Sequence, residues 1–160
     1  FLKIPEPLIQ KNFSRIMSLK DATKKMSKSD PSDLSRINLS DDDELMISKI
    51  KKAKTDSKPM PDIDEDLEKR LEAENLLGIY SSLSNQSLEK SKKEFSGKNF
   101  SQFKENLSNL LIEKIGPISK EIKKLLNDEK YLDNILFEGS KKANEIASKK
   151  INEMKKLIGF

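Results

Sequence analysis

The sequence predicts a mainly α-helical protein in which a helical bundle follows a shorter non-helical segment. Leucine, isoleucine, lysine and glutamate dominate the second half of the chain, and its apolar residues recur at spacings of three and four. Glycine occurs only five times in 160 residues, and tryptophan is absent. Hydrophobic residues make up 34% of the chain and charged residues 36%, so we expect a lean helical core.

The absence of cysteine and histidine limits the chemistry of the chain. It excludes disulfides, thiol nucleophiles, imidazole bases and the usual zinc sites, and we predict no protein-bound metal. The apolar runs are far shorter than a membrane span, and the first residues lack the layout of a signal peptide. We therefore expect a soluble, cytoplasmic protein with no membrane partner. Because the first residue is phenylalanine, we also expect further sequence ahead of it.

The net charge of +4 is unevenly distributed. Residues 1–30 carry seven basic and three acidic side chains, residues 31–99 twelve and fifteen, and residues 100–160 twelve and nine, giving +4, −3 and +3. Both ends of the chain are positive, which favours partners that bear phosphate. Solvated lysine-rich helices have the same composition, so charge alone leaves both interpretations open.

The first predicted elements are the end of a buried strand and a loop. Arg15–Leu19 has the pattern of the end of a buried strand, and Thr23–Asp30 follows it. The second segment is a poor helix and a poor strand, because its serines compete for backbone hydrogen bonds and Pro31 restricts Asp30. We expect it to be an exposed, mobile loop that concentrates positive charge.

A helix is predicted over residues 41–54. Ser40 and Asp43 form a capping box at its start, and its buried face should hold Met46, Ile50 and Ala53. The acidic run at this helix start suits the helix dipole better than a cation site, since a turn glycine and ligand spacing are missing. The two prolines and several acids of residues 55–66 predict a surface linker without regular structure.

The remaining residues should form the helical bundle. Helices are predicted over 67–85, over 88–95 with Gly97 as its stop, from Asn99 onward with Gln102 completing its cap, and over 129–158 with Gly159 as its stop. Pro117 should break or kink the third of these. The apolar stripe of each helix should be buried, and we place Phe100, Phe103 and Tyr131 in the core in preference to base-stacking positions.

The loop carries the candidate functional residues. Lys25 and Lys28 are interleaved with Ser27 and Ser29, and ammonium groups and hydroxyls suit phosphate oxygens. On composition alone, a solvated loop that binds nothing is the commoner alternative. The order of the residues changes this balance, because residues 25–29 read KMSKS, the second signature of class I aminoacyl-tRNA synthetases.

The flanks of this signature resemble the tryptophanyl-tRNA synthetase family. The resemblance covers nearly the whole chain, through RIMSLKDATKKMSKSD, IKKAKTDS, NLLGIYSSLSNQS, FSGKNFSQFKENL and EGSKKANEIASKKI. It implies that residues 1–39 are the C-terminal end of a Rossmann-like catalytic domain with its KMSKS loop. Residues 40–66 would be a connecting helix and linker, and residues 67–160 a helical region that binds the tRNA anticodon arm.

The resemblance also implies a reaction. Tryptophan and ATP, with Mg²⁺, would form an adenylate and pyrophosphate, and the aminoacyl group would pass to tRNA(Trp). Lys25 and Lys28 would be catalytic by neutralising charge on the leaving pyrophosphate. The ATP-binding set would be Ile16, through its main chain to adenine, and the loop residues Lys25, Met26, Ser27, Lys28 and Ser29.

The family is homodimeric through the half that the resemblance does not cover, so the chain alone is compatible with a monomer. That half holds the HIGH-type signature, and we expect residues 1–160 to be inactive alone. A tyrosyl-tRNA synthetase relative is the nearest alternative, although such enzymes would carry a further C-terminal domain. A noncatalytic helical tRNA-binding module and a helical interaction protein without a nucleic-acid role are the alternatives outside the enzyme class.

Overall fold

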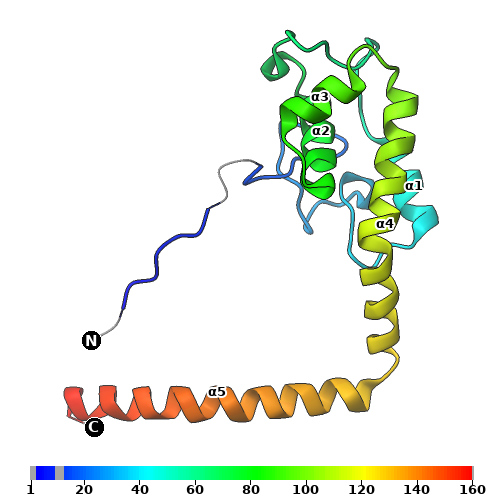
Figure 1. Cartoon of the computed structure of the whole chain (residues 1–160). Helices are drawn as coiled ribbons and strands as arrows, with labels where there is room; N and C mark the ends of the chain where they lie inside the picture. The colour runs from blue at the N-terminus through cyan, green and yellow to red at the C-terminus, as the bar shows by residue number, and fades with distance from the viewer. Residues whose placement is uncertain (1–2, 10–12, 160) are drawn as a thin grey trace. The chain divides into compact units, whose positions relative to one another are not determined.

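The computed structural model describes residues 3–9 and 13–159, and its regular structure is helical (Figure 1). Five α-helices and no β-strand occur within these residues. They are α1 (Asp43–Lys52), α2 (Leu71–Ser84), α3 (Leu88–Phe95), α4 (Phe100–Leu126) and α5 (Glu129–Ile158). The predicted mainly α-helical fold is confirmed. None of the described helices combines the length and apolar character that a bilayer crossing requires.

The chain divides into two compact units, residues 1–119 and residues 120–160. Helices α1, α2 and α3 belong to the first unit, α5 belongs to the second, and α4 contributes residues to both. The boundaries predicted after residues 39 and 66 come from the family resemblance and differ in kind from this division into compact units. They stay a prediction.

The core of the first unit is built from four helices, the segment before α1 and the segment between α1 and α2. Its aromatic centre is Phe95 of α3, which meets Tyr80 of α2 edge-on at 4.8 Å between ring centroids and Phe103 of α4 at 4.9 Å. The other buried apolar residues are Leu19, Met46, Ile50, Ala53, Met60, Leu76, Leu77, Ile79, Leu107 and Leu111. The predicted inner face of α1 and the core position of Phe103 are confirmed, and Phe100 is partly buried against the same cluster.

The strand end predicted at Arg15–Leu19 is wrong as regular structure. Met17 forms one isolated antiparallel bridge with Lys25. This bridge does not extend into a strand pair, because the chain turns at Lys28 and Ser29. The backbone N–H of Met17 is bonded to a side chain of α2 and not to another strand. The segment is nevertheless anchored, since Leu19 is buried in the core.

Two helix starts differ from their predictions. α1 begins at Asp43 with Asp42 as its N-cap, whose side chain accepts a hydrogen bond from the Leu45 N–H at 2.9 Å. The predicted box of Ser40 and Asp43 is therefore wrong. α2 begins at Leu71, because Leu67–Lys69 forms a separate 3-10 turn.

The α3 helix has its predicted ends, and Asn99 caps α4 through the Gln102 N–H as expected. Pro117, however, lies inside α4, which continues to Leu126. The helix gives up only the hydrogen bond that residue 117 would donate to the carbonyl of Glu113, an exposed position that water can reach.

The linker over residues 55–66 lacks helix and strand as predicted, but it is not purely a surface segment. Met60 is buried, its N–H donates to the Lys98 carbonyl at 2.7 Å, and its carbonyl accepts from the Gly97 N–H. Gly97 takes a positive φ of 70°, a conformation that glycine adopts without strain. Arg70 fixes the linker further by an ion pair with Asp56 at 2.7 Å.

Helix α5 has the predicted ends but not the predicted burial. Asp128 caps its start, and Gly159 stops it in a left-handed conformation. No residue of α5 is buried, so the expected burial of its apolar stripe, Tyr131 included, is wrong. Within its own unit, α5 can pack only against the end of α4. That short segment has too few apolar side chains to bury the apolar stripe of a 30-residue helix.

Candidate functional site

The lysine loop, defined here as Thr23–Asp30, begins with a turn organised by Asp21. The Asp21 carboxylate accepts hydrogen bonds from the Thr23 hydroxyl at 2.6 Å and from the Thr23 N–H at 3.1 Å. These bonds lower the pKa of Asp21 below its ordinary value of 3.8. Asp21 also pairs with Lys24 at 3.3 Å, so Lys24 is held back from the loop tip.

Backbone pairing connects the loop to the segment before it. The Ser18 N–H donates to the Lys24 carbonyl at 2.8 Å, and the Met26 N–H donates to the Ile16 carbonyl at 3.0 Å. The structure thus brings Ile16 next to Lys25 and Met26, and their binding of ATP stays a prediction. The Met26 side chain packs against the core, which fixes the start of the KMSKS segment.

The tip of the loop presents its polar groups to solvent. Lys25, Lys28 and Ser29 are exposed, and neither lysine ammonium has a hydrogen bond or ion pair with any residue that the structure describes. Ser27 is half-buried, and its hydroxyl oxygen accepts from the Ser29 N–H at 3.2 Å. Two unneutralised cations beside two hydroxyls can bind and stabilise a polyanion.

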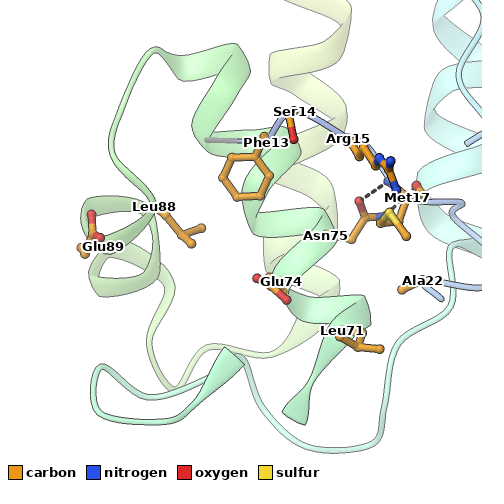
Figure 2. Close-up of a pocket in the computed structure, with 10 residues that line it drawn as sticks. All are labelled: Phe13, Ser14, Arg15, Met17, Ala22, Leu71, Glu74, Asn75, Leu88 and Glu89. Atoms are coloured by element: carbon orange, nitrogen blue, oxygen red, sulfur yellow. Dashed lines mark hydrogen bonds between the residues drawn. The ribbon is translucent and has the colours of Figure 1, made fainter. Parts of the chain in front are cut away.

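The segment that leads into the loop is held by a residue that the sequence did not single out. Asn75 of α2 accepts from the Met17 N–H at 2.9 Å, and its amide nitrogen donates to the Met17 carbonyl at 2.9 Å (Figure 2). Asn75 is buried, and it acts at Met17 as a neighbouring strand would. One hint of this role was present in the sequence, which is that Asn75 is a polar residue directly before the apolar pair Leu76 and Leu77.

A cavity of about 490 Å³ lies beside this contact (Figure 2). Residues before the loop, α2 and α3 line it, and its charged members are Arg15, Glu74 and Glu89. None of the predicted ATP-binding residues lines it. The candidate site is therefore the open surface around Lys25 and Lys28, and this cavity is a separate feature.

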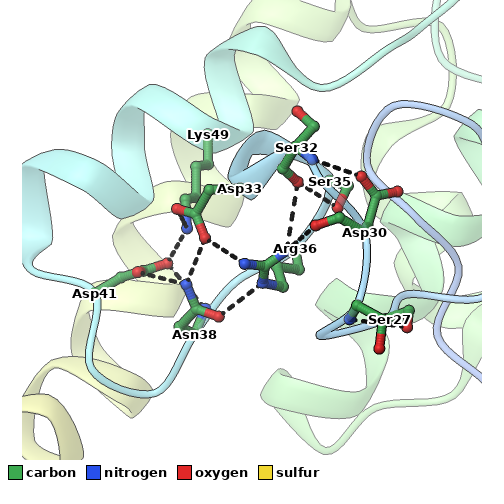
Figure 3. A network of polar contacts seen from close by, with 10 residues as sticks. Ser27, Asp30, Ser32, Asp33, Ser35, Arg36, Asn38, Asp41 and Lys49 are labelled. Carbon is green, nitrogen blue, oxygen red and sulfur yellow. Dashed lines mark hydrogen bonds and ion pairs between the residues drawn. The ribbon is translucent and has the colours of Figure 1, made fainter.

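Charged and polar side chains hold the chain directly after the loop (Figure 3). Lys49 of α1 is fully buried, and its ammonium bonds to Asp41 at 2.6 Å and to Asp33 at 2.7 Å. The hydrogen bond from Lys49, and then that from Asn38, lower the pKa of Asp33. The Asp41 carboxylate is thus engaged in the ion pair with Lys49. Among the described residues, no group of three or more Asp, Glu, His or Cys could hold a metal ion.

Comparison with known proteins identifies relatives over the whole chain. The family described as tRNA synthetases class I (W and Y) matches residues 1–116. A tryptophan–tRNA ligase of Agrobacterium fabrum is 49% identical over 160 residues, which are 100% of this chain and 45% of the relative. The Rickettsia felis tryptophan–tRNA ligase is 50% identical over 159 residues, which are 99% of this chain and 48% of the relative. The chain thus spans slightly less than half the length of these relatives.

Solved structures have the same fold. The crystal structure of tryptophanyl-tRNA synthetase from Mycoplasma pneumoniae matches with a TM-score of 0.76 and 26% identity, covering 94% of this chain and 47% of that one. The Campylobacter jejuni synthetase, crystallised with ADP and tryptophan, matches in fold with a TM-score of 0.66 at 23% identity, covering 91% and 44%. Since the family model covers most of its sequence, this chain belongs to the class I tRNA synthetases of the tryptophan and tyrosine family.

Proposed function

We propose that this chain is the C-terminal part of a tryptophan–tRNA ligase. The enzyme would join tryptophan to ATP as tryptophanyl-adenylate, release pyrophosphate and transfer the aminoacyl group to tRNA(Trp). The observation that carries this proposal is the exposed KMSKS turn, in which Lys25 and Lys28 have no neutralising partner among the described residues. Identity of 49% and 50% to relatives named tryptophan–tRNA ligase supports tryptophan over tyrosine.

The loop residues take distinct roles in this proposal. Lys25 and Lys28 stabilise the charge that grows on pyrophosphate as it leaves, which lowers the barrier without any proton transfer. The hydroxyls of Ser27 and Ser29 donate to phosphate oxygens. Met26 holds the segment against the core, and the main chain of Ile16 meets the adenine ring.

Mg²⁺ enters this scheme with the nucleotide. It keeps several waters and is commonly bound through substrate phosphates and one or two carboxylates, so ATP itself would supply much of its coordination. We further propose that residues 1–39 end the catalytic domain, residues 40–66 connect it, and residues 67–160 contact the tRNA. The whole enzyme would be a cytoplasmic homodimer.

The test is tryptophan-dependent exchange of pyrophosphate into ATP by the complete product of the gene that encodes this chain. We expect exchange with the complete product. We expect none with residues 1–160 alone, because the lysines need an ATP-accepting fold opposite them. Comparable exchange by residues 1–160 alone would contradict this assignment of the chain. No exchange by the complete product, together with salt-sensitive binding of tRNA, would favour the noncatalytic tRNA-binding module.

Lys28→Ala tests the role of the loop within the complete product. Removing a charge that acts on the leaving group should lower the single-turnover rate of adenylate formation by about 10²-fold or more, with tryptophan affinity nearly unchanged. Lys52→Ala is the matched control, because Lys52 is an exposed lysine of α1 outside the loop. A rate for Lys28→Ala within a few-fold of the control would remove Lys28 from the mechanism.

A further inference from the structure

The chain after the lysine loop contains a network of balanced charges in which Lys49 and Asp41 are buried while Asp33 is half exposed. Lys49 lies between the carboxylates of Asp33 and Asp41. The amide nitrogen of Asn38 donates to both carboxylates, at 3.0 Å and 3.1 Å. Arg36 supplies the second positive charge through its contact with Asp33 at 2.9 Å. Two cations thus face two anions, which makes the burial of Lys49 tolerable and fixes each partner in position.

Arg36 transmits this fixed geometry to the loop (Figure 3). Its Nε donates to Asn38 at 3.1 Å, while its Nη1 donates to the Asp30 carbonyl at 3.0 Å and to the Ser32 carbonyl at 3.5 Å. The planar guanidinium can make these contacts and the pair with Asp33 at once because its N–H groups have fixed directions. A lysine at this position could reach only part of the set.

The Asp30 peptide is the last fixed point of the loop. Its N–H donates to the Ser27 carbonyl at 3.4 Å, and its side chain accepts from the Ser32 N–H at 2.8 Å. Lys28 and Ser29 lie between Ser27 and Asp30, the two residues that this backbone bond joins. On the other side of the tip, the backbone bond between Met26 and Ile16 holds the chain. Both ends of the tip are therefore anchored.

We propose that Arg36 is a positioning residue for the lysine loop, supported through Asp33 by the buried Lys49. It holds the Asp30 peptide in place and thereby confines the Lys28 ammonium to the region that the leaving phosphate occupies. Its effect on catalysis rests on the proposed function, whereas its effect on the loop does not. Arg36 touches no reacting atom in this scheme and acts only through the position of Lys28.

The first test measures the loop without reference to activity. In the 160-residue chain, trypsin cleavage after Lys28 reports how often the loop opens, provided that reclosing is faster than cleavage. Cleavage after Lys130 in the same digest serves as the reference, since Lys130 is exposed on α5 in the other unit. Arg36→Lys keeps both the charge and the number of tryptic sites. We expect it to raise the cleavage ratio on the order of tenfold, the effect of one lost hydrogen bond to a charged group.

Arg70→Lys is the matched control for this measurement. Arg70 is a more deeply buried arginine that bonds to Asp56, Glu65 and the Pro59 carbonyl, none of which belongs to the lysine loop. It should leave the cleavage ratio unchanged. If Arg36→Lys fails to unfold cooperatively, Asp33→Asn takes its place, because Lys49 then retains Asp41 as its partner. An unchanged ratio in the folded variant would overturn the proposal.

The second test asks whether Arg36 acts through Lys28. In the complete gene product, Arg36→Lys should lower the rate of adenylate formation on the order of tenfold, and the same change in a Lys28→Ala background should have almost no effect. A role in general stability would give equal effects in the two backgrounds, and that result would overturn the proposal. If the unmodified product shows no exchange, the proposed function fails, while the cleavage test still decides the role of Arg36 in the loop.

Discussion

Asn75 joins two segments that lie 58 residues apart in sequence, and its contribution to the free energy of unfolding can be measured. Asn75→Ala would leave the partly buried N–H and carbonyl of Met17 without their partner, at a cost of about 1 kcal/mol, the low end of the range for an unsatisfied buried group. Urea denaturation should therefore show a lower midpoint with a similar slope. Asn106→Ala is the control, since Asn106 is exposed on α4. Equal midpoints for the two variants would show that water replaces the amide of Asn75 without loss.

Asp33 should make the stability of the fold depend on pH in acid. Lys49 and Arg36 face it with positive charge, Asn38 donates to it, and Asp41 is the neighbouring carboxylate. Its pKa is lowered from the ordinary value of 3.8 by the bond from Lys49 and then by that from Asn38. A carboxylate with a lower pKa in the folded chain stabilises the fold above its unfolded pKa, and this contribution disappears as the pH falls through the folded value.

The advantage of wild type over Asp33→Asn should therefore be constant above about pH 5 and shrink below about pH 4. The measurement is urea denaturation of both proteins across this range. An advantage that stayed constant into strongly acidic solution would mean that the charge of Asp33 does not stabilise the fold.

The loop residues that the sequence predicted form a local motif, whereas the supporting residues that it missed contact segments distant in sequence. Lys25, Ser27 and Lys28 are adjacent in a motif, so their order alone identified the loop. Asn75 and Lys49 act on segments that only the folded chain brings together, and neither has a local pattern that distinguishes it from an ordinary helix residue. Sequence reasoning therefore found the groups that face solvent and missed those that hold them in place.

At the scale of elements, the period of apolar residues predicted the helices well, and capping residues predicted their ends less well. Several acceptors near the start of α1 could have capped it. The structure selects Asp42 because Asp41 is occupied by Lys49 and Asn38, a contact that a short sequence window does not contain. Pro117 was predicted to break or kink its helix, and it does not break it, since the cost of a proline depends on whether the released carbonyl is exposed.

The cap of α1 gives a direct test at this scale. Asp42→Ala should lower the free energy of unfolding by about 1 kcal/mol, because the Leu45 N–H loses its acceptor. Ser40→Ala should have almost no effect, although the sequence pattern had favoured it as the cap. Urea denaturation of both variants distinguishes the two assignments, and a larger loss for Ser40→Ala would restore the predicted capping box.

For the whole molecule, periodicity showed that α5 has an apolar stripe but could not show what covers it. A stripe of this kind is equally compatible with an internal core, another part of a longer enzyme and a second copy of the chain. The hydrophobic core of the first unit, by contrast, is complete within itself, because all of its buried members lie between Leu19 and Leu111. The predicted burial of the α5 stripe was wrong because it assumed that every apolar stripe in the chain meets another stripe of the same chain.

This independence predicts that the first unit keeps its stability when α5 is removed. A chain that ends at Asn127 retains all of α4 and every core residue. Its urea midpoint should match that of the full chain carrying Tyr131→Phe, in which Tyr80 is likewise the sole source of tyrosine fluorescence. The far-UV helical signal should fall by the share that α5 contributes. Repeating the full chain at several protein concentrations is the control, because pairing of α5 stripes between copies would make its midpoint depend on concentration. A lower midpoint for the shortened chain at every concentration would mean that α5 stabilises the first unit, since nothing else has been removed.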